Sequence, residues 1–454
     1  MSDVKGGGLR ARVQAGYAEW ILLGFTTLLL ASVYFGTNTN LPPIMFLFGI
    51  FLLGYLDPRP GKGLSHFWPA AGISGAILLL AFFRSDFVEL IAHGMPIGKA
   101  YDTSTRYFQA PMVMWFTTWA MIAAAWRLGE DNSRRVIAWA SWLILILTAI
   151  QFVDAAGNDG LRNWMNVHWF HGLRPEMVVV DASNFNCLLL MLFWPLAFWF
   201  AHRGWMLAIG AMAVTVLWAS VTVDTNAHML VLVLGALVFF AAKYWPSAWT
   251  RRGILPERVA AGLALFWVLV FPPVMLLLMR TGIAAVLHAK LPPSWSARID
   301  IWSYAIDRCL DKPLWGWGYE ASRRFAPAIP LHTHNLSLQA WLELGIPGLL
   351  LLGAFWFSIF WFIAPKGSSS FARLEQTGLV EIGQATVTDE GPATTAEQAA
   401  RPYMLAAVTG YFLLNAISYG IWRDWLICMG ALMVMTGAMA IKAVKSDMKL
   451  RIKL

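Results

Sequence analysis

Charged side chains are scarce in this sequence, and so are cysteines. Asp, Glu, Lys and Arg make up only 13% of the 454 residues, whereas hydrophobic residues make up 58%. A soluble domain of this size could not cover its surface with so few charges, so a water-soluble protein is excluded. The three cysteines, Cys187, Cys309 and Cys428, are too few and too widely spaced for a disulfide framework.

The chain contains instead a series of long apolar runs. A helix needs about 20 apolar residues to cross a bilayer, because the hydrocarbon has no water to satisfy backbone groups. We expect spans at 20–36, 41–56, 68–83, 111–126, 136–153, 185–201, 205–221, 227–242, 258–279, 346–363, 403–419 and 425–441. The predicted fold class is therefore an all-α polytopic membrane protein with about 12 transmembrane helices.

The basic residues predict how these spans are oriented. If the N-terminus lies inside, most of the 34 Lys and Arg residues fall in cytoplasmic segments, and both termini are cytoplasmic. Basic loops against anionic membrane lipids then account for the net charge of +8, and no nucleic-acid partner is needed. The basic N-terminal stretch has no small-residue cleavage site after Leu28-Leu29-Leu30, so we expect the first span to be retained.

The loops divide the chain into three parts. Residues 1–279 hold nine spans with their outer loops, 280–335 form a long periplasmic loop between spans nine and ten, and 336–454 hold the last three spans. A cytoplasmic linker at 364–401 is rich in small and acidic residues, a composition typical of disorder. Almost no ionisable side chain lies deep in a span, which argues against an ion-coupled transporter and points to the loops for chemistry.

The long loop opens with a predicted amphipathic helix after Pro292-Pro293. Apolar residues recur at helical spacing over 294–306, so this helix is expected to lie at the membrane surface. Arg298 and Trp302 are four residues apart, and the indole could therefore flank the guanidinium; an ordinary surface pair is the alternative. The glycines of Pro313-Leu314-Trp315-Gly316-Trp317-Gly318-Tyr319 predict a tight turn that brings backbone close to another segment.

The end of the loop carries Arg323-Arg324 and then His332-Thr333-His334-Asn335. Asn335 is a candidate N-cap for a helix that opens at Leu336. Gly345-Ile346-Pro347-Gly348 interrupts that helix, so 336–344 is predicted to be a short interfacial piece. The positive end of this helix would oppose protonation of His334 and keep it neutral, as a general base requires. Alternatively, both histidines are ordinary surface residues.

Read together, these motifs resemble a known family. The order is Arg298-x-x-x-Trp302, the Trp-Gly turn, His332-Thr333-His334-Asn335, and Glu343-Leu344-Gly345-x-Pro347-Gly348. It is similar to the signature region of the O-antigen ligases and the Wzy-type O-antigen and exopolysaccharide polymerases. The resemblance implies a GT-C-like fold in the bacterial inner membrane and transfer of a glycan from an undecaprenyl-diphosphate carrier, on the periplasmic face, without metal or cofactor. It leaves open whether the acceptor is a lipid A-core sugar or another carrier-linked glycan.

The resemblance also implies roles for single residues. His334 would be the base that deprotonates the acceptor hydroxyl, and Arg298 would hold the diphosphate. Arg174 is the looser match to a second family arginine, and His332, Trp302, Arg323 and Arg324 are the remaining candidates for substrate binding. Where the family often has a Ser-Arg pair at the eighth span, this chain has Asp224-Thr225-Asn226-Ala227-His228.

The residues argue against two alternatives, transport and a zinc site. A lipid-linked oligosaccharide flippase or transporter would need a charged central cavity, for which the spans provide no residues. His168 and His171 could bind zinc together with His332 and His334, but their spacing matches no known zinc motif, so metal-independent chemistry is expected.

Overall fold

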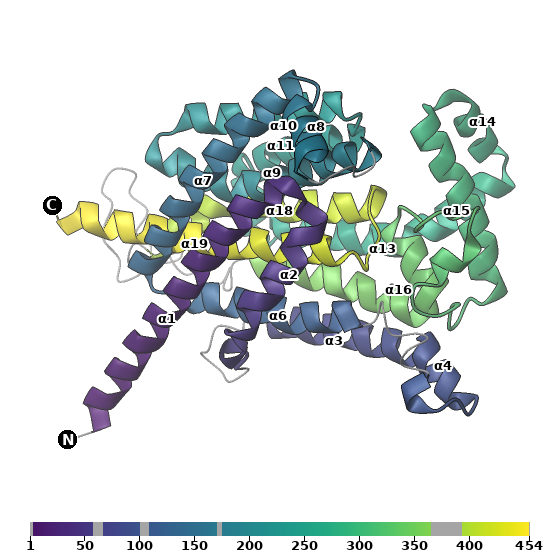
Figure 1. Cartoon of the computed structure of the whole chain (residues 1–454), viewed down its shortest axis with the longest axis horizontal. Helices are drawn as coiled ribbons and strands as arrows, with labels where there is room; N and C mark the ends of the chain where they lie inside the picture. The colour runs from purple at the N-terminus through teal and green to yellow at the C-terminus, as the bar shows by residue number, and fades with distance from the viewer. Residues whose placement is uncertain (1–2, 58–66, 100–108, 170–174, 365–392, 454) are drawn as a thin grey trace.

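The computed structural model describes residues 3–57, 67–99, 109–169, 175–364 and 393–453, and the regular elements in these ranges are all helical (Figure 1). The first half contains α1 Asp3–Ser32, η1 Val33–Phe35, α2 Thr37–Ile50, η2 Leu53–Tyr55, α3 Trp68–Phe83, α4 Asp86–Ala92, α6 Gln109–Arg127, α7 Glu130–Ala156, α8 Gly160–His168, α9 Pro175–Arg203 and α10 Met206–Thr222. The second half contains α11 Asn226–Lys243, α12 Ser247–Arg251, α13 Pro256–Arg280, α14 Ile283–Lys290, α15 Pro293–Asp311, η4 Ala321–Phe325, α16 Leu336–Ile363, α18 Ala393–Ile417 and α19 Asp424–Lys453.

Seven of the described helices are long and apolar enough to cross a membrane. They are Gly16–Phe35, Glu130–Ala156, Met177–Arg203, Asn226–Lys243, Pro256–Arg280, Leu336–Ile363 and Asp424–Leu450, and α3 and α10 are shorter apolar helices. The predicted class, an all-α polytopic membrane protein, is confirmed. Each of the twelve predicted stretches coincides with a helix, while their number as membrane spans stays a prediction.

Helix α19 lies at the centre of the bundle, where it packs against α2, α6, α7, α9 and α18. Glycines allow its close approach to α18: a Cβ at Gly430 would lie 2.6 Å from Cζ of Tyr411, and one at Gly437 would lie 2.6 Å from Sδ of Met404. Because lipid tails are as apolar as the helices, such close van der Waals packing is a main source of helix association in a membrane.

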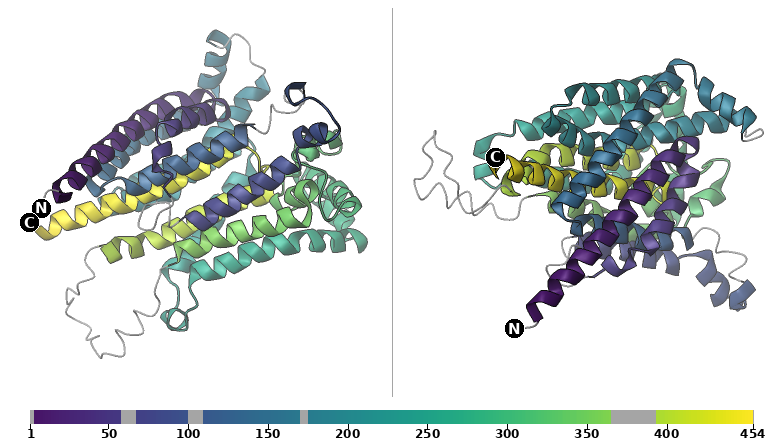
Figure 2. Two further views of the ribbon diagram at one scale, coloured as in Figure 1. Left: turned by 90° about the horizontal axis from the view of Figure 1, so that it is seen from below. Right: turned by 60° about the vertical axis from the view of Figure 1, so that its left-hand side comes forward.

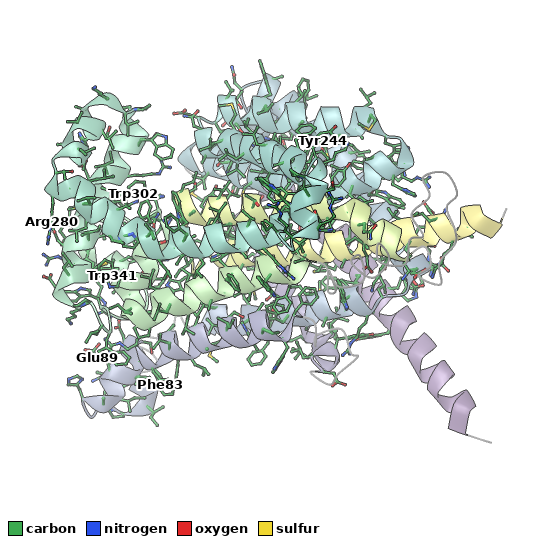
Figure 3. The ribbon with its side chains drawn as sticks, turned by 180° about the vertical axis from the view of Figure 1, so that it is seen from behind. Phe83, Glu89, Tyr244, Arg280, Trp302 and Trp341 are labelled. Atoms are coloured by element: carbon green, nitrogen blue, oxygen red, sulfur yellow. The ribbon has the colours of Figure 1, made fainter. Side chains whose placement is uncertain are left out.

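The two ends of the bundle differ. The first turn of α1 and the last turn of α19 lie at one end, and α4, α14 and α15 lie at the other (Figure 2). Figure 3 shows the second end from behind; Trp302, Trp341, Arg280, the last residue of α13, and Phe83, the last residue of α3, are all labelled at this end. The predicted long loop 280–335 therefore gathers at one end of the bundle.

Helix α18 begins earlier than the predicted span. Residues 393–401, the last part of the predicted linker, are helical, which corrects that part of the prediction. Arg401 holds this turn in place through a bidentate ion pair with Glu257 of α13, at 2.8 and 2.9 Å, and composition alone does not reveal such a partner. The rest of the predicted linker, 365–392, lies outside the described residues.

Candidate active site at the end of the bundle

The site is built around the start of α16. Asn335 caps this helix, since its side chain accepts a hydrogen bond from the backbone N–H of Leu338 at 3.0 Å, as predicted. Its amide nitrogen also donates to the carbonyl of Ala416 at 2.9 Å. A single buried side chain thus ties the start of α16 to the end of α18 and brings the short turn 418–423 next to the histidines.

The predicted interruption of α16 is present as a kink. Gly345 has φ +69°, which only glycine adopts without strain, and a Cβ there would lie 2.1 Å from the carbonyl oxygen of Leu314. The carbonyls of Leu342 and Glu343 accept hydrogen bonds from the amides of Trp317 and Gly318, at 2.8 and 2.9 Å. The predicted tight turn at 313–319 therefore approaches this kink and satisfies backbone groups that the broken helix leaves free.

His334 has a defined tautomer. Its φ is +53°, a left-handed conformation that is uncommon outside glycine and that recurs at functional sites. Its Nδ1 lies 2.7 Å from the carbonyl oxygen of Ser418, and since a carbonyl only accepts, Nδ1 carries the proton. The lone pair is then on Nε2, which has no hydrogen-bond partner in the part of the chain that the structure describes. This ring can accept a proton from a bound hydroxyl.

Burial keeps His334 neutral. Burial lowers the pKa of His334 below its usual value; the Ser418 carbonyl opposes this shift, and the Arg298 and Arg423 guanidiniums reinforce it. The sequence predicts a neutral ring because of the helix N-terminus. The structure gives the same state, with burial as its largest cause.

His332 is the more buried of the two histidines. Burial, together with His334 and neighbouring arginines, lowers the pKa of His332 to about 2. Its Nδ1 accepts a hydrogen bond from the backbone N–H of His334 at 3.1 Å, and the two ring centroids are 4.1 Å apart. His332 is thus a neutral ring that supports the backbone of His334.

Arg298 lies on α15, which confirms the predicted helix at 294–306. Burial lowers its pKa, but arginine starts so high that it remains a cation. Its Nη1 donates to the carbonyl of Ser294 at 3.0 Å, and its Nε is buried without a partner. No acidic side chain among the described residues pairs with it. Arg298 therefore has donors available for an anionic ligand.

The predicted contact between Arg298 and Trp302 is wrong. The guanidinium stacks on Trp295, 5.0 Å from the ring centroid, one turn before Arg298. Trp302 turns inward, packs edge-on against Phe271 and donates its indole N–H to the carbonyl of Thr333 at 2.9 Å. Helical spacing allows either ring beside Arg298, and packing against α13 decides between them.

The other predicted substrate-binding residues lie in different surroundings. Arg323 pairs with Glu320 at 3.1 Å and lines a small cleft together with His332. Arg324 is exposed and pairs with Asp86 of α4, away from that cleft. Arg174 lies outside the described residues. No group of three or more potential metal ligands is found in the described ranges.

Glu343 joins three segments beneath the histidines. Its carboxylate is fully buried and accepts hydrogen bonds from Oγ of Ser322 at 2.6 Å, from Nε2 of Gln339 at 3.2 Å and from the indole of Trp422. Gln339 in turn accepts from the backbone N–H of Ile421 at 3.0 Å. The carboxylate thus fixes η4 and the turn 418–423 against α16, and holds the acceptor of the His334 hydrogen bond in place.

Part of the chain matches the sequence model of a known family. The sequence model of the O-antigen ligase family matches residues 223–353, a segment that runs from the turn before α11 into α16 and includes Arg298 and His334. This segment is therefore similar to the O-antigen ligase family. This match confirms the resemblance seen in the sequence.

Related proteins occur in Rickettsia. Proteins named "Putative polysaccharide ligase" from Rickettsia conorii and Rickettsia typhi are each 26% identical over 152 residues, which is 30% of this chain and 30% of each relative. A protein of the same name from Rickettsia bellii is 25% identical over 219 residues, or 45% of this chain and 44% of the relative. The similarity thus spans less than half the length of each relative.

Sequence reasoning missed Arg423. This residue of the 418–423 turn lies outside the O-antigen ligase segment, yet it lines the same cleft as His332 and lowers the pKa of both histidines. No acidic side chain among the described residues forms an ion pair with it. A signal did exist, because an arginine in a short loop that is predicted to lie outside departs from the preference for basic residues on the cytoplasmic side.

Proposed function

We propose that the protein is a metal-independent glycosyltransferase that moves a glycan from an undecaprenyl-diphosphate carrier to an acceptor sugar hydroxyl on the periplasmic face. The observation that carries this proposal is the His334 ring, whose Nδ1–H is held by the Ser418 carbonyl while Nε2 remains available. The match of residues 223–353 to the O-antigen ligase family supports the same class of reaction.

The proposed step balances as follows. Nε2 of His334 takes the proton of the acceptor hydroxyl, the hydroxyl oxygen attacks the anomeric carbon, and the bond from that carbon to the diphosphate breaks. The departing diphosphate keeps the electron pair. A positioned base contributes about 100-fold to 10,000-fold to the rate.

Two arginines are suited to stabilise the leaving group. Arg298 and Arg423 lie close enough to His334 to lower its pKa, and neither has an acidic partner among the described residues. Negative charge grows on the diphosphate oxygens as the glycosidic bond breaks, so fixed cations beside them lower the barrier. Arginine is favoured here because its planar fork binds two phosphate oxygens at once.

The surroundings of Arg298 also suit a lipid carrier. An apolar cavity of about 450 Å³ lies between α13, α14 and α15 and is lined by Phe271, Leu287, Trp295, Ile299 and Trp302 among others. Three of these side chains come from α15, the helix that carries Arg298. A polyprenyl chain in this cavity would have its diphosphate next to the Arg298 guanidinium.

A second apolar cavity, of about 200 Å³, begins beside Trp422 and continues along α19 to Val434. The α19 residues that line it run from Ile427 to Val434, over about 10 Å at the rise of an α-helix. Trp302, which lines the first cavity, bonds to Thr333, and Trp422, which lines the second, also lines the cleft that contains His332. This fits a reaction in which donor and acceptor are both attached to lipids. This holds for a lipid A-core acceptor and for a carrier-linked glycan repeat.

The periplasmic location rests on the distribution of Lys and Arg. The described ends of α1 and α19 lie opposite the candidate site, so a cytoplasmic N-terminus places His334 outside. Cysteine substitution at exposed Leu331, followed by labelling with a membrane-impermeant maleimide in intact spheroplasts, tests this. Labelling only after the membrane is opened contradicts the proposal.

Reconstitution tests the reaction itself. Proteoliposomes that contain the full chain, a labelled undecaprenyl-diphosphate glycan and a lipid A-core acceptor or a second carrier-linked glycan should form a new glycosidic bond. His334→Ala should abolish it at unchanged protein level. Movement of labelled lipid across the bilayer without bond formation contradicts the proposal and indicates a flippase. The acceptor that becomes extended distinguishes a ligase from a polymerase.

A further inference from the structure

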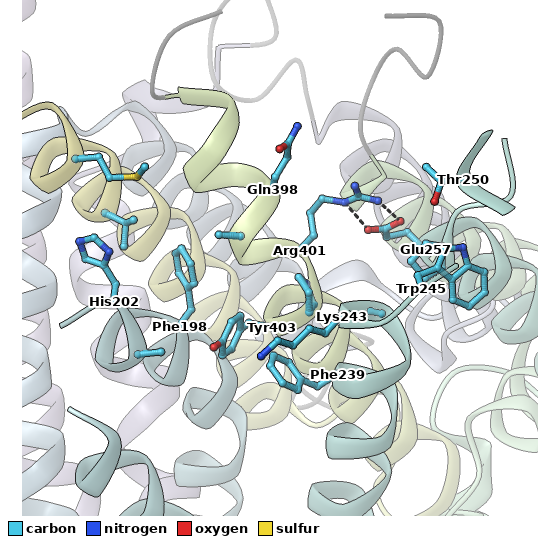
Figure 4. A pocket seen from close by; sticks show the side chains of 17 residues that line it. Phe198, His202, Phe239, Lys243, Trp245, Thr250, Glu257, Gln398, Arg401 and Tyr403 are labelled. Carbon is cyan, nitrogen blue, oxygen red and sulfur yellow. Dashed lines mark hydrogen bonds and ion pairs between the residues drawn. The ribbon is translucent and has the colours of Figure 1, made fainter. Parts of the chain in front are cut away.

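A large cavity lies at the end of the bundle opposite His334, where nothing in the proposed reaction takes place. Its volume is about 890 Å³, within the range of about 300–1,000 Å³ typical of small-molecule sites. The C-terminal parts of α9, α11 and α19 and the N-terminal parts of α13 and α18 surround it. Figure 4 shows the cavity and the side chains that line it.

One wall of the cavity is aromatic. Tyr403 packs against Phe198 with ring centroids 5.5 Å apart and against Phe239 at 4.6 Å, so residues from α9, α11 and α18 form one continuous apolar surface. Lys243 lies at the edge of this surface, with its ammonium 5.7 Å from the centroid of Phe239. The arrangement combines an apolar surface with a cation at its rim.

The charges that face the cavity are mostly positive. Lys243 has no acidic partner in the described part of the chain. Arg401 borders the cavity from α18 and pairs with Glu257, but this bond uses only two of the five donors of the guanidinium. The pair is therefore neutral in charge and still able to donate, while Lys243 leaves one positive charge uncompensated.

Asp447, close to the cavity, does not reverse this balance. Its carboxylate accepts from Arg134 at 2.8 Å and from Arg203 at 3.3 Å, and His202, which lines the cavity, lies 3.6 Å away. Two guanidiniums thus share one carboxylate. The whole region carries net positive charge beside an aromatic surface.

We propose that this cavity binds the headgroup of an anionic phospholipid. The phosphodiester would lie between Lys243 and the free donors of Arg401, and an acyl chain would follow the surface formed by Phe198, Phe239 and Tyr403. Helix ends at a membrane surface place basic side chains at headgroup depth, and basic pockets between membrane helices bind anionic lipids. The site is separate from the proposed active site and does not depend on the proposed reaction.

Native mass spectrometry of the detergent-purified full chain tests the proposal. Dioleoyl phosphatidylglycerol and dioleoyl phosphatidylethanolamine have the same acyl chains, so only the headgroup charge differs. The wild-type protein should retain the anionic lipid about tenfold more than the zwitterionic one. Lys243→Gln should reduce this ratio to near one, and Lys243→Arg should keep it.

Arg252→Gln is the matched control, because Arg252 is an exposed basic residue at the same end that does not line the cavity. Its ratio should equal that of the wild type. An unchanged ratio in Lys243→Gln, or equal loss in Arg252→Gln, overturns the proposal. Displacement of the lipid by millimolar inorganic phosphate also overturns it, because the ligand would then be a soluble anion.

The melting temperature provides a second test if a variant gives no interpretable mass spectrum. Phosphatidylglycerol should raise the melting temperature of the wild-type protein and of Arg252→Gln, because a ligand that binds only the folded state stabilises it. The melting temperature of Lys243→Gln should not respond to the lipid. An equal rise in all three proteins contradicts the site.

Discussion

The indole N–H of Trp302 donates a hydrogen bond to the carbonyl oxygen of Thr333, 2.9 Å away, and thereby connects the helix that carries Arg298 to the residue before His334. Trp302 is buried between α13 and the histidine segment. The base and the diphosphate-binding arginine of the proposed reaction are thus held in register by a side chain that need not contact substrate. Substitutions can distinguish such positioning residues from those that act on the substrate.

Trp302→Phe should keep the apolar packing but lose the hydrogen bond to Thr333. We expect glycan transfer to fall by roughly tenfold to a hundredfold, because small displacements of a catalytic group cost rate steeply. Turnover in proteoliposomes measures this. Trp315→Phe is the control, since Trp315 is 57% exposed in the same loop and should leave transfer unchanged. Equal activity in both variants would show that the Trp302 hydrogen bond does not position His334.

The pH dependence of transfer should report the lowered pKa of His334. The neutral ring is the active form of a base, so activity is retained above the folded pKa and falls as the pH drops through it. Because burial lowers that pKa, the acid limb should lie below about pH 6.5, the usual histidine value. Single-turnover rates across this range measure it. An acid limb above pH 7 contradicts the assignment.

His288→Ala provides the control for His334→Ala. His288 lies on α14 in the same loop, is exposed and pairs with Asp300 at 3.1 Å. His288→Ala should change neither the rate of transfer nor the pH at which activity falls. His334→Ala should lose transfer at every pH. Loss of transfer in both variants would point to the integrity of the loop rather than to a base.

Arg298→Ala and Arg423→Ala should each slow transfer by about 100-fold or more, as the loss of a preorganised donor to a developing anion does. Arg298→Lys should recover only part of this rate, since an ammonium cannot bind two phosphate oxygens in one plane. Arg308→Ala is the control, because Arg308 pairs with Asp311 at 3.0 Å near the end of α15. Wild-type transfer in Arg423→Ala would remove that residue from the proposed site.

Glu343→Gln should destabilise the protein and reduce transfer without abolishing it. An amide offers one acceptor oxygen, and its NH₂ group would face Ser322 or Trp422, whose donors now bind the carboxylate. Each buried donor left without an acceptor costs about 1–3 kcal/mol. The melting temperature and turnover are measured together with Glu89→Gln, an exposed control on α4. An unchanged melting temperature in Glu343→Gln contradicts the buried network.

Local features of the fold could be predicted because their causes are local. Runs of apolar residues must become helices where no water satisfies the backbone, so every predicted stretch coincides with a helix. Asn335 as an N-cap and the kink at Gly345 follow in the same way from side-chain and backbone chemistry within a few residues. The sequence pattern around His334 was also sufficient to reveal the resemblance to the O-antigen ligases.

Contacts between distant segments could not be predicted. The ring beside Arg298 is Trp295 rather than Trp302, because Trp302 packs in the interior against Phe271 of α13. The role of Arg423 depends on a turn that is distant in sequence from the histidines, and a single sequence carries no record of that proximity. Similarly, the ion pair with Glu257 explains why residues 393–401 are helical despite their linker composition.

The sequence by itself determined that this is a helical membrane protein with a segment similar to the O-antigen ligases, and it indicated His334 and Arg298 as the residues to examine. These properties depend on the types of residue and on the spacing between residues that are close in sequence, and both can be read from the sequence alone. The tertiary structure decided the tautomer of His334, through the Ser418 carbonyl, and brought Arg423 and the Glu343 network to the same place. Those properties require helices remote in sequence to pack together, because hydrogen bonding and burial depend on which groups become neighbours.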